Sequence, residues 1–380
     1  MPVLRSIRER FSSEKPLNGL KVGACLHVTA ETANLARTLV AGGAEVALCA
    51  ANPLSTQDDV ATVLAEEMLV RAAHGTNPGP GQADVAAWGP TVTLDDGADL
   101  LWLLHEGDAI PEGFLGATEE TTTGLVRARA LGLKVPVLAL NEARTERVFN
   151  DHYGTGQSTL DGILRATNML IAGRTVVVLG YGTTGHGIAA RARGAGAQVI
   201  VCEVDPLRAL EARMEGFDVM PALAAAAVGD VFITVTGVPG VLGAEHFAAM
   251  KDGATLANAG HFDVEIDLPA LDAAASDRRE VLPLVEQFVV GDRKLNLLAQ
   301  GRVVNLAAGQ GHPAEIMDIS FALHALAVEW LAREGGALEA GIHQVPADLD
   351  REVARLKLSA LGVGIDTISD AQEAYRSTWG

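Results

Sequence analysis

Residues 176–205, VVVLGYGTTGHGIAARARGAGAQVIVCEVD, constrain the fold of this chain more than any other stretch. An apolar, β-branched run ends at Gly180, and Gly180, Gly182 and Gly185 then form a G-x-G-x-x-G pattern. An alanine-rich helical segment follows, and then a second apolar run that closes on Glu203. The segment therefore predicts a strand, a tight glycine turn, a helix and a second strand, which is the context in which this glycine pattern binds a dinucleotide.

Each residue of this pattern has a physical role in binding NAD. Gly180 permits the tight turn, Gly182 lets the pyrophosphate approach the backbone, and Gly185 lets helix and strand pack closely. The helix N-terminus offers amide donors and a positive dipole end to the phosphates. Glu203 can accept hydrogen bonds from a ribose diol and would repel a 2′-phosphate, so NAD is favoured over NADP. The simpler alternative is a glycine-rich turn in an ordinary strand–helix–strand unit.

Composition bounds the class of protein. A chain of 380 residues predicts two domains, and 48% hydrophobic residues support buried cores. The formal charge of −19 argues against a nucleic-acid partner. The N-terminus is charged and no apolar run reaches membrane-spanning length, so we expect no signal peptide and no membrane partner. Cys25, Cys49 and Cys202 lack metal-ligand spacing, so we predict no metal and a reducing cytoplasm.

A second strand–helix–strand unit occupies residues 20–50 and lacks the glycine pattern. Two such units, far apart in sequence, predict an α/β protein with two doubly wound, parallel-sheet, Rossmann-like domains. We expect a substrate (nucleoside) domain at 1–155 completed by 312–344, an NAD-binding domain at 156–311, and a short helical tail at 345–380.

Further elements follow from local patterns. Apolar runs predict more strands, and a long apolar periodicity predicts a helix over 315–333. Glycine and proline over 75–90 predict a surface loop. The additional strands are expected at 92–96, 134–140, 229–236 and 254–260.

Polar side chains follow several of the predicted strands. His27, Asp96 and Asn141 stand at strand carboxyl ends, where open α/β sheets bind ligands. His261 and His312 stand in polar, glycine-rich turns, where an acid/base role and a structural role are equally reasonable. Asp96 is a candidate general base.

Two polar clusters can each be interpreted in two ways. Asp95, Asp96 and Asp99 are compatible with a metal cluster or with a solvated turn. The hydroxyls of residues 121–123 can hold a nicotinamide amide or cap a helix.

The motifs together resemble the S-adenosylhomocysteine hydrolase (adenosylhomocysteinase) family. They run in family order across nearly the whole chain, and their density is highly specific. They include CLHVTAET (25–32), LDDGADL (94–100), EETTTG (119–124), LDGILRATNMLIAG (160–173), EVDP (203–206), NAGHFDVEID (258–267) and GRVVNLAAGQGHP (301–313).

The resemblance implies an unusual use of tightly bound NAD on an adenosine-type substrate. The cofactor oxidises the 3′-hydroxyl, and the ketone acidifies the C4′ proton. Elimination at C5′ then expels homocysteine, water adds, and the ketone is reduced back. It also implies a place in one-carbon metabolism, closure of the domains around the nucleoside, and a homo-oligomer, either a dimer or a tetramer.

Residue roles are carried over by the same resemblance. The catalytic group comprises His27, Asp96, Glu120, Asn141, Glu146, Asn150 and His261. The cofactor group comprises Thr121, Thr122, Thr123, Asp151, Gly180, Gly182, Thr183, Thr184, Gly185, Glu203, Val204, Thr236, Gly260 and Asn305. The substrate group comprises Thr29, Glu31, Gln310, Gly311 and His312.

The chain departs from the family at the hydride-transfer end. The family lysine that helps to deprotonate the 3′-hydroxyl falls on Glu146, the family aspartate falls on Asn150, and the next asparagine falls on Asp151. A glutamate cannot stabilise an alkoxide as a lysine does, though it can serve as a base. Arg144 or Arg147 is a candidate replacement for the missing cation.

Other departures are Gln310 in place of a methionine and a C-terminus without the family's Lys/Tyr tail. Three hypotheses follow from all of these changes. The first is ordinary adenosylhomocysteinase activity. The second is a divergent enzyme that adds or removes another C5′ group in specialised metabolism. The third is a non-catalytic regulator that binds NAD and a nucleoside.

Overall fold

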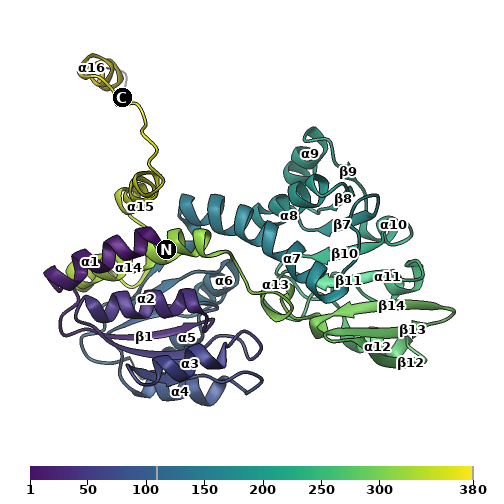
Figure 1. Cartoon of the computed structure of the whole chain (residues 1–380), viewed down its shortest axis with the longest axis horizontal. Helices are drawn as coiled ribbons and strands as arrows, with labels where there is room; N and C mark the ends of the chain where they lie inside the picture. The colour runs from purple at the N-terminus through teal and green to yellow at the C-terminus, as the bar shows by residue number, and fades with distance from the viewer. Residues whose placement is uncertain (108–109, 379–380) are drawn as a thin grey trace.

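The computed structural model describes residues 1–107 and 110–378, and these residues form two α/β units side by side (Figure 1). Residues 108–109 of the predicted first domain and 379–380 of the predicted tail lie outside the described part. Each unit is built around its own sheet. The predicted fold class of two doubly wound domains with a helical C-terminal segment is confirmed.

The first sheet is parallel throughout. Its spatial order is β15-β6-β5-β4-β1-β2-β3. The chain winds outward from β1 to β3, returns to β4 and winds the other way, so the winding reverses between β1 and β4. These strands are β1 (Lys21–Leu26), β2 (Glu45–Ala50), β3 (Leu69–Arg71), β4 (Val92–Asp95), β5 (Gly116–Glu119), β6 (Pro136–Ala139) and β15 (Gly341–Gln344).

Apolar runs explain why these strands lie in the interior. Residues 22–26 of β1 are fully buried, and Val22 pairs in register with Val46 and Val92, as expected for a parallel sheet covered on both faces. The covering helices are α1 (Pro2–Glu14), α2 (Ala30–Ala41), α3 (Asp58–Leu64), α4 (Gly79–Ala87), α5 (Asp99–Glu106), α6 (Thr122–Ala130) and α14 (Ala314–Glu334).

The second sheet has the spatial order β12-β13-β14-β11-β10-β7-β8-β9. From β9 to β14 it has the strand order of dinucleotide-binding folds, with the reversal between β7 and β10. The β12–β13–β14 edge is antiparallel. These strands are β7 (Thr175–Leu179), β8 (Gln198–Cys202), β9 (Asp218–Val219), β10 (Val231–Thr234), β11 (Thr255–Asn258), β12 (Asp277–Leu282), β13 (Val285–Val290) and β14 (Arg293–Leu298).

Helices cover both faces of this sheet, and apolar cores lie on each side of it. They are α7 (Gly156–Thr167), α8 (Thr183–Gly194), α9 (Pro206–Met214), α10 (Ala222–Ala226), α11 (Ala244–Ala249), α12 (Leu268–Ala274) and α13 (Val304–Ala307). Short helical turns complete the chain at η1 (Leu140–Glu142), η3 (Ala299–Gly301) and η4 (Gly335–Ala337).

The chain crosses between the units twice. The first crossing is a π-helix, η2 (Glu146–Thr155), which continues into α7. The second runs from α13 into α14, whose buried face packs into the first core. Asp318 on α14 anchors this return: its carboxylate accepts from the Val3 and Leu4 amides at the start of α1 and pairs with Lys357.

The C-terminal segment has two parts. α15 (Ala347–Ala360) contacts α14 and α1, whereas α16 (Asp370–Ser377) has no buried residue and extends away from both units (Figure 1). No helix within the described residues is both long and apolar enough to cross a membrane. The predicted loop at 75–90 is corrected, because α4 begins at Gly79, immediately after Pro78.

Candidate active site

A pocket of about 1400 Å³ lies where the carboxyl ends of the two sheets face each other. His27 and Asp96, which follow β1 and β4, line it from the first unit. Gly180 and Thr236, which follow β7 and β10, line it from the second. Both walls thus come from the strands where the winding reverses, which is where doubly wound sheets bind ligands. Single-ligand pockets are about 300–1000 Å³, so this one has room for a dinucleotide and a second small molecule.

The glycine turn forms the dinucleotide end of the pocket. Gly180 has φ +107°, a backbone conformation that favours glycine, and a Cβ atom on Gly185 would lie 2.0 Å from the Gly180 carbonyl oxygen. Gly185 therefore packs helix against strand and does not line the pocket. Gly182 precedes the first residue of α8, so the helix N-terminus faces the pocket.

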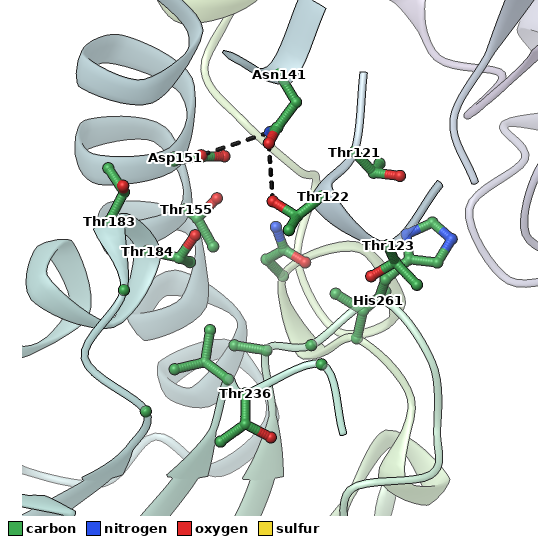
Figure 2. Close-up of a pocket in the computed structure, with 18 of the residues that line it drawn as sticks. Thr121, Thr122, Thr123, Asn141, Asp151, Thr155, Thr183, Thr184, Thr236 and His261 are labelled. Carbon is green, nitrogen blue, oxygen red and sulfur yellow. Dashed lines mark hydrogen bonds between the residues drawn. The ribbon is translucent and has the colours of Figure 1, made fainter. Parts of the chain in front are cut away.

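The Glu203 carboxylate stands at the rim of this turn. The backbone amides of Tyr181 and Val204 donate to its two oxygens at 2.7 Å each, and Asp205 donates at 3.0 Å. Figure 2 shows Thr183 and Thr184 at the start of α8 near Thr155 of η2. The amides of Tyr181, Val204 and Asp205 fix the Glu203 carboxylate at the position where a ribose diol is expected.

The neighbouring loop depends on a residue that sequence reasoning missed. Glu265 is buried and accepts from the amide and hydroxyl of Thr236 at 2.8 Å each, and from the Gly237 amide at 2.8 Å. A Cβ atom on Gly260 would overlap the Glu265 carboxylate, so glycine is required there. The acidic residue in the segment DVEID was the available signal, but its partners lie about 30 positions away in the sequence.

Asp96 joins two histidines from different units. Its Oδ2 atom lies 3.1 Å from Nε2 of His27, and its Oδ1 atom lies 3.5 Å from Nδ1 of His261. Ser55 holds the other ring nitrogen of His27 at 2.6 Å. The three site groups are largely buried and all face the pocket.

This arrangement separates the pKa values of the three groups. Burial alone would raise the pKa of Asp96, but His27 and His261 overcome it and hold the pKa at about 2. Burial alone would lower the pKa of His27, but Asp96 overcomes it and raises the pKa above its ordinary value. Burial lowers the pKa of His261. The cluster thus holds an ionised carboxylate beside one protonatable and one neutral imidazole, which is suited to proton transfer.

Glu120 lines the pocket at the end of β5. Its Oε1 atom accepts from Asn150 Nδ2 at 3.3 Å, and its Oε2 atom lies 3.1 Å from Nε2 of His324. Asn150 also donates to Ser320 at 2.7 Å, and Ser320 donates to Glu146 Oε2 at 2.9 Å. Neither Ser320 nor His324 stands out in the sequence, because both occupy the apolar periodicity of α14.

The π-helix η2 explains how its polar residues come together. Hydrogen bonds of a π-helix link residues five apart, so residues four or five positions apart share one side. Glu146, Asn150, Asp151 and Thr155 have this spacing. Asn150, Asp151 and Thr155 line the pocket, whereas Glu146 lies behind Asn150 and is 1% exposed.

Burial disfavours the ionised form of Glu146. Burial raises its pKa well above the ordinary range, and the neighbouring Glu120 raises it further. Its Oε1 atom has no hydrogen-bond partner among the described residues. As placed here, Glu146 reaches the pocket only through Ser320 and Asn150 and does not contact the pocket space directly.

The predicted nicotinamide-side residues form a second network. Thr122 donates to Asn141 Oδ1 at 2.7 Å, and Asn141 Nδ2 lies 3.5 Å from Asp151 (Figure 2). Burial raises the pKa of Asp151 to about 7, although Asn141 and Arg147 oppose it. Arg144 and Arg147 are both exposed, but of the two only Arg147 lines the pocket.

The predicted substrate residues also line the pocket. Thr29 caps the start of α2, which places Glu31 in its first turn and against the pocket. Thr155 Oγ1 lies 3.0 Å from Nε2 of His312, and burial lowers the pKa of His312 to about 4. Of all the predicted site residues, only Glu146 and Gly185 do not line this pocket.

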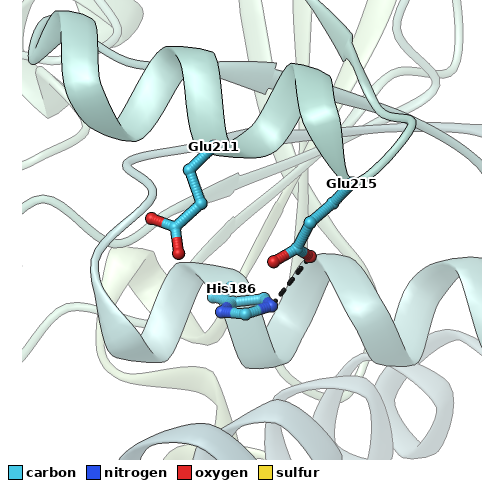
Figure 3. Close-up of side chains that lie close together, drawn as sticks. All are labelled: His186, Glu211 and Glu215. Carbon is cyan, nitrogen blue, oxygen red and sulfur yellow. Dashed lines mark ion pairs between the residues drawn. The ribbon is translucent and has the colours of Figure 1, made fainter.

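A second cluster lies outside the pocket. His186 on α8, Glu211 on α9 and Glu215 just after α9 place one ligand atom each within 4.8 Å of one another (Figure 3). Glu215 already pairs with His186 at 2.9 Å and accepts from the Tyr181 hydroxyl at 3.0 Å. These contacts already occupy His186 and Glu215, and we assign no ion to the cluster.

Comparisons with known proteins point to one family. Residues 151–311 match the model "S-adenosyl-L-homocysteine hydrolase, NAD binding domain", and residues 1–115 match "S-adenosyl-L-homocysteine hydrolase". The adenosylhomocysteinase of Aquifex aeolicus is 54% identical over 100% of this chain and 93% of its own length. The S-inosyl-L-homocysteine hydrolase of Methanosarcina mazei is 51% identical over 100% of this chain and 94% of its own length.

The comparison with solved structures concerns the fold alone. The dipicolinate synthase chain from Bacillus halodurans aligns with a TM-score of 0.52 at 15% identity, covering 84% of this chain and 100% of that one.

Proposed function

Because the chain belongs to the S-adenosyl-L-homocysteine hydrolase family, an NAD-dependent enzyme family, we propose that it cleaves S-adenosyl-L-homocysteine to adenosine and homocysteine through a 3′-keto intermediate. The observation that carries the proposal is the shared pocket. The acid–base cluster of His27, Asp96 and His261 and the Glu120 carboxylate face the same space as the glycine turn. This arrangement supports a redox step and a C5′ proton transfer on one bound nucleoside.

The residues present fit NAD. Asn305 lines the pocket, its Nδ2 atom donates to Ser158 at 3.1 Å, and its buried Oδ1 atom has no partner among the described residues. That orphan acceptor suits a carboxamide donor. Glu203 and the start of α8 suit a ribose and a pyrophosphate. When bound, NAD supplies reversible oxidation of a secondary alcohol.

The protein's own groups then divide the proton transfers. Glu120, held by Asn150 and His324, takes the proton of the 3′-hydroxyl. At C5′, Asp96 keeps His27 protonatable beside the leaving group, so the imidazolium donates to the departing sulfur and its neutral form activates the water that adds.

The base of the nucleoside defines a second candidate substrate. A relative named S-inosyl-L-homocysteine hydrolase is as similar as most of the adenosylhomocysteinases. We favour adenine, because the Glu31 carboxylate lines the pocket and suits the two-hydrogen donor of an exocyclic amine. Hypoxanthine offers one N–H donor and a carbonyl acceptor that a carboxylate repels.

The test is release of a thiol from each candidate. NAD-loaded protein is incubated with S-adenosyl-L-homocysteine or S-inosyl-L-homocysteine, and free homocysteine is titrated with a thiol reagent. We expect faster release from the adenosyl compound. Release from the inosyl compound alone would reassign the base, and release from neither would contradict the proposed reaction.

The domain boundaries at 1–155 with 312–344, 156–311 and 345–380 also stay a proposal, as do the roles of the individual site residues. Formation of a homodimer or homotetramer and a cytoplasmic location are proposed on the family resemblance.

A further inference from the structure

We propose that Asp350, on the C-terminal helix α15, is a positioning residue that fixes the start of the π-helix η2 and thereby holds Asn150 and Asp151 in the active site. The inference rests on the proposed function, because it concerns the pocket of the proposed reaction. Asp350 does not line that pocket, and it follows its partner Thr145 by 205 positions in the sequence. It therefore acts on the site only through η2.

The helical turn that leads into η2 cannot cap itself. The backbone of Ala143 is extended, with ψ 147°, and its carbonyl accepts from the Arg147 amide at 3.1 Å, so the helical hydrogen bonds begin at Ala143. The amides of the next two residues, Arg144 and Thr145, have no acceptor within a helix that begins there. An alanine side chain cannot supply one. These two donors need an acceptor from another part of the chain.

The Asp350 carboxylate is that acceptor. Its Oδ2 atom accepts from the Arg144 amide at 3.1 Å, and its Oδ1 atom accepts from the Thr145 amide at 3.1 Å. The Thr145 hydroxyl donates to the same Oδ1 atom at 2.5 Å. The helix dipole also favours a negative charge at this end. One side chain of the C-terminal segment thus makes three hydrogen bonds to the start of η2.

The geometry of η2 makes its start important for the site. A π-helix is rare and mostly limited to a single turn, whereas η2 spans 10 residues. Asn150 donates to both Glu120 and Ser320. Asp151 faces Asn141 across 3.5 Å. Because the residues of a helix turn together about its axis, a shift at the start of η2 would move both side chains away from these partners.

The helix that carries Asp350 is itself anchored. Lys357, about two helical turns after Asp350 and on the same face, pairs with Asp318 at 2.9 Å and donates to the Glu315 carbonyl at 3.0 Å. The side chain of Asp318 is 0% exposed, and Val353 of α15 is buried in the first core. α15 thus joins η2 and α14, the two helices through which the chain crosses between the units.

A positioning role and a role limited to fold stability predict different results for Asp350→Ala. If Asp350 only stabilises the fold, the melting temperature should fall and the turnover of the folded protein should not change. If Asp350 positions η2, the folded variant should turn over about 10- to 100-fold more slowly, because displacements of about 1 Å have effects of this size. NAD affinity should change far less than turnover, because the glycine turn and Glu203 belong to the second unit.

The test measures thiol release from S-adenosyl-L-homocysteine by the NAD-loaded, full-length protein. Values of kcat and KM are determined at a temperature where circular dichroism shows each variant to be folded. Asp348→Ala is the matched control, because Asp348 also lies on α15, its side chain is 92% exposed, and it pairs with Arg351 of the same helix. We expect the loss of kcat in Asp350→Ala alone. A kcat equal to that of the wild type would overturn the inference and leave the proposed function intact.

A second measurement does not depend on activity. Hydrogen–deuterium exchange of the backbone over residues 144–155 should be faster in Asp350→Ala than in the wild type, and unchanged in Asp348→Ala. Unchanged exchange in Asp350→Ala would overturn the inference whatever the activity. Absence of thiol release by the wild type would instead overturn the proposed function and, with it, the role of Asp350 in the reaction.

A milder variant keeps the test decisive if Asp350→Ala does not fold. In Asp350→Asn the Oδ1 atom can keep both bonds to Thr145, but the amide nitrogen cannot accept from Arg144. We expect kcat to fall by about 2- to 10-fold, which corresponds to the loss of one hydrogen bond. A kcat and an exchange rate equal to those of the wild type would overturn the inference.

Discussion

Oδ1 of Asp96 lies 3.5 Å from Nδ1 of His261, although the two residues follow strands of different sheets. The approach is tight, because a Cβ atom on the adjacent Gly97 would lie 2.9 Å from Nε2 of the same histidine. Gly97 also has φ +109°, which favours glycine. The acid–base cluster is therefore complete only when the two units face each other as they do here.

Replacing Asp96 with asparagine should separate the two halves of the reaction. Asp96→Asn removes the charge that holds His27 protonatable, so thiol release should fall by about 10²- to 10⁴-fold. Reduction of bound NAD by adenosine should change far less, because we assign the 3′-hydroxyl proton to Glu120. Thiol assays and the absorbance of reduced nicotinamide give the two rates. Equal losses in both would contradict the division of roles.

The ion pair of Asp96 and His27 predicts a range of pH within which the pair stabilises the fold. The pKa of Asp96 is depressed to about 2, so its contribution is present above the ordinary value of 3.8 and is lost as pH falls toward 2. The pKa of His27 is raised, so its contribution is present below the ordinary value of 6.5 and is lost as pH rises through the raised value.

The difference in unfolding free energy between the wild type and Asp96→Asn should therefore peak between these limits. Denaturant melts across the pH range measure it. A difference that is flat with pH would show that the pair is not an ion pair.

Glu146 should behave as a buried neutral acid. Its pKa is raised, so it stabilises the fold below the ordinary value of 4.5 and loses that contribution as pH rises through the raised value. Glu146→Gln keeps an acceptor for Ser320. This variant should not show the decline in unfolding free energy above pH 4.5. Glu146→Ala leaves the Ser320 hydroxyl without its acceptor and should cost about 1–3 kcal/mol. Identical melting of both variants at neutral pH would contradict the placement.

Cofactor preference should depend on Glu203. Glu203→Ala removes the proposed acceptor for the ribose diol and should weaken NAD binding by about tenfold or more. The same substitution should reduce the preference for NAD over NADP. Arg208 lines the same pocket and can then bind a 2′-phosphate. Fluorescence titration with both cofactors measures this, and Glu245→Gln on α11 is the matched control. An unchanged ratio of affinities would contradict the assignment.

Local pattern predicted much of this molecule. The strand–helix–strand units at 20–50 and 176–205, the strand at 92–96 and the helix at 315–333 occur close to the expected positions. Each of these elements depends on an apolar run or on a hydrophobic periodicity among residues close together in the sequence. The parallel sheets follow from these units, because buried strands that alternate with helices have few other ways to pack.

Contacts between distant segments were not predictable in this way. The family resemblance places position 146 at the reacting hydroxyl, but the π-helix sets the Glu146 side chain behind Asn150. His324 stands within an apolar helix pattern, and its polar partner Glu120 is 204 positions away. Glu265 likewise binds a loop that only the folded chain brings near.

The central claim is that this pocket oxidises the nucleoside at C3′ and thereby labilises C4′. The most direct test is incorporation of deuterium at C4′ of adenosine after incubation of the NAD-loaded protein in heavy water, read by mass spectrometry and NMR. We predict exchange at C4′ alone, abolished by Glu120→Gln. No exchange, with adenosine binding confirmed by calorimetry, would contradict redox chemistry on this substrate.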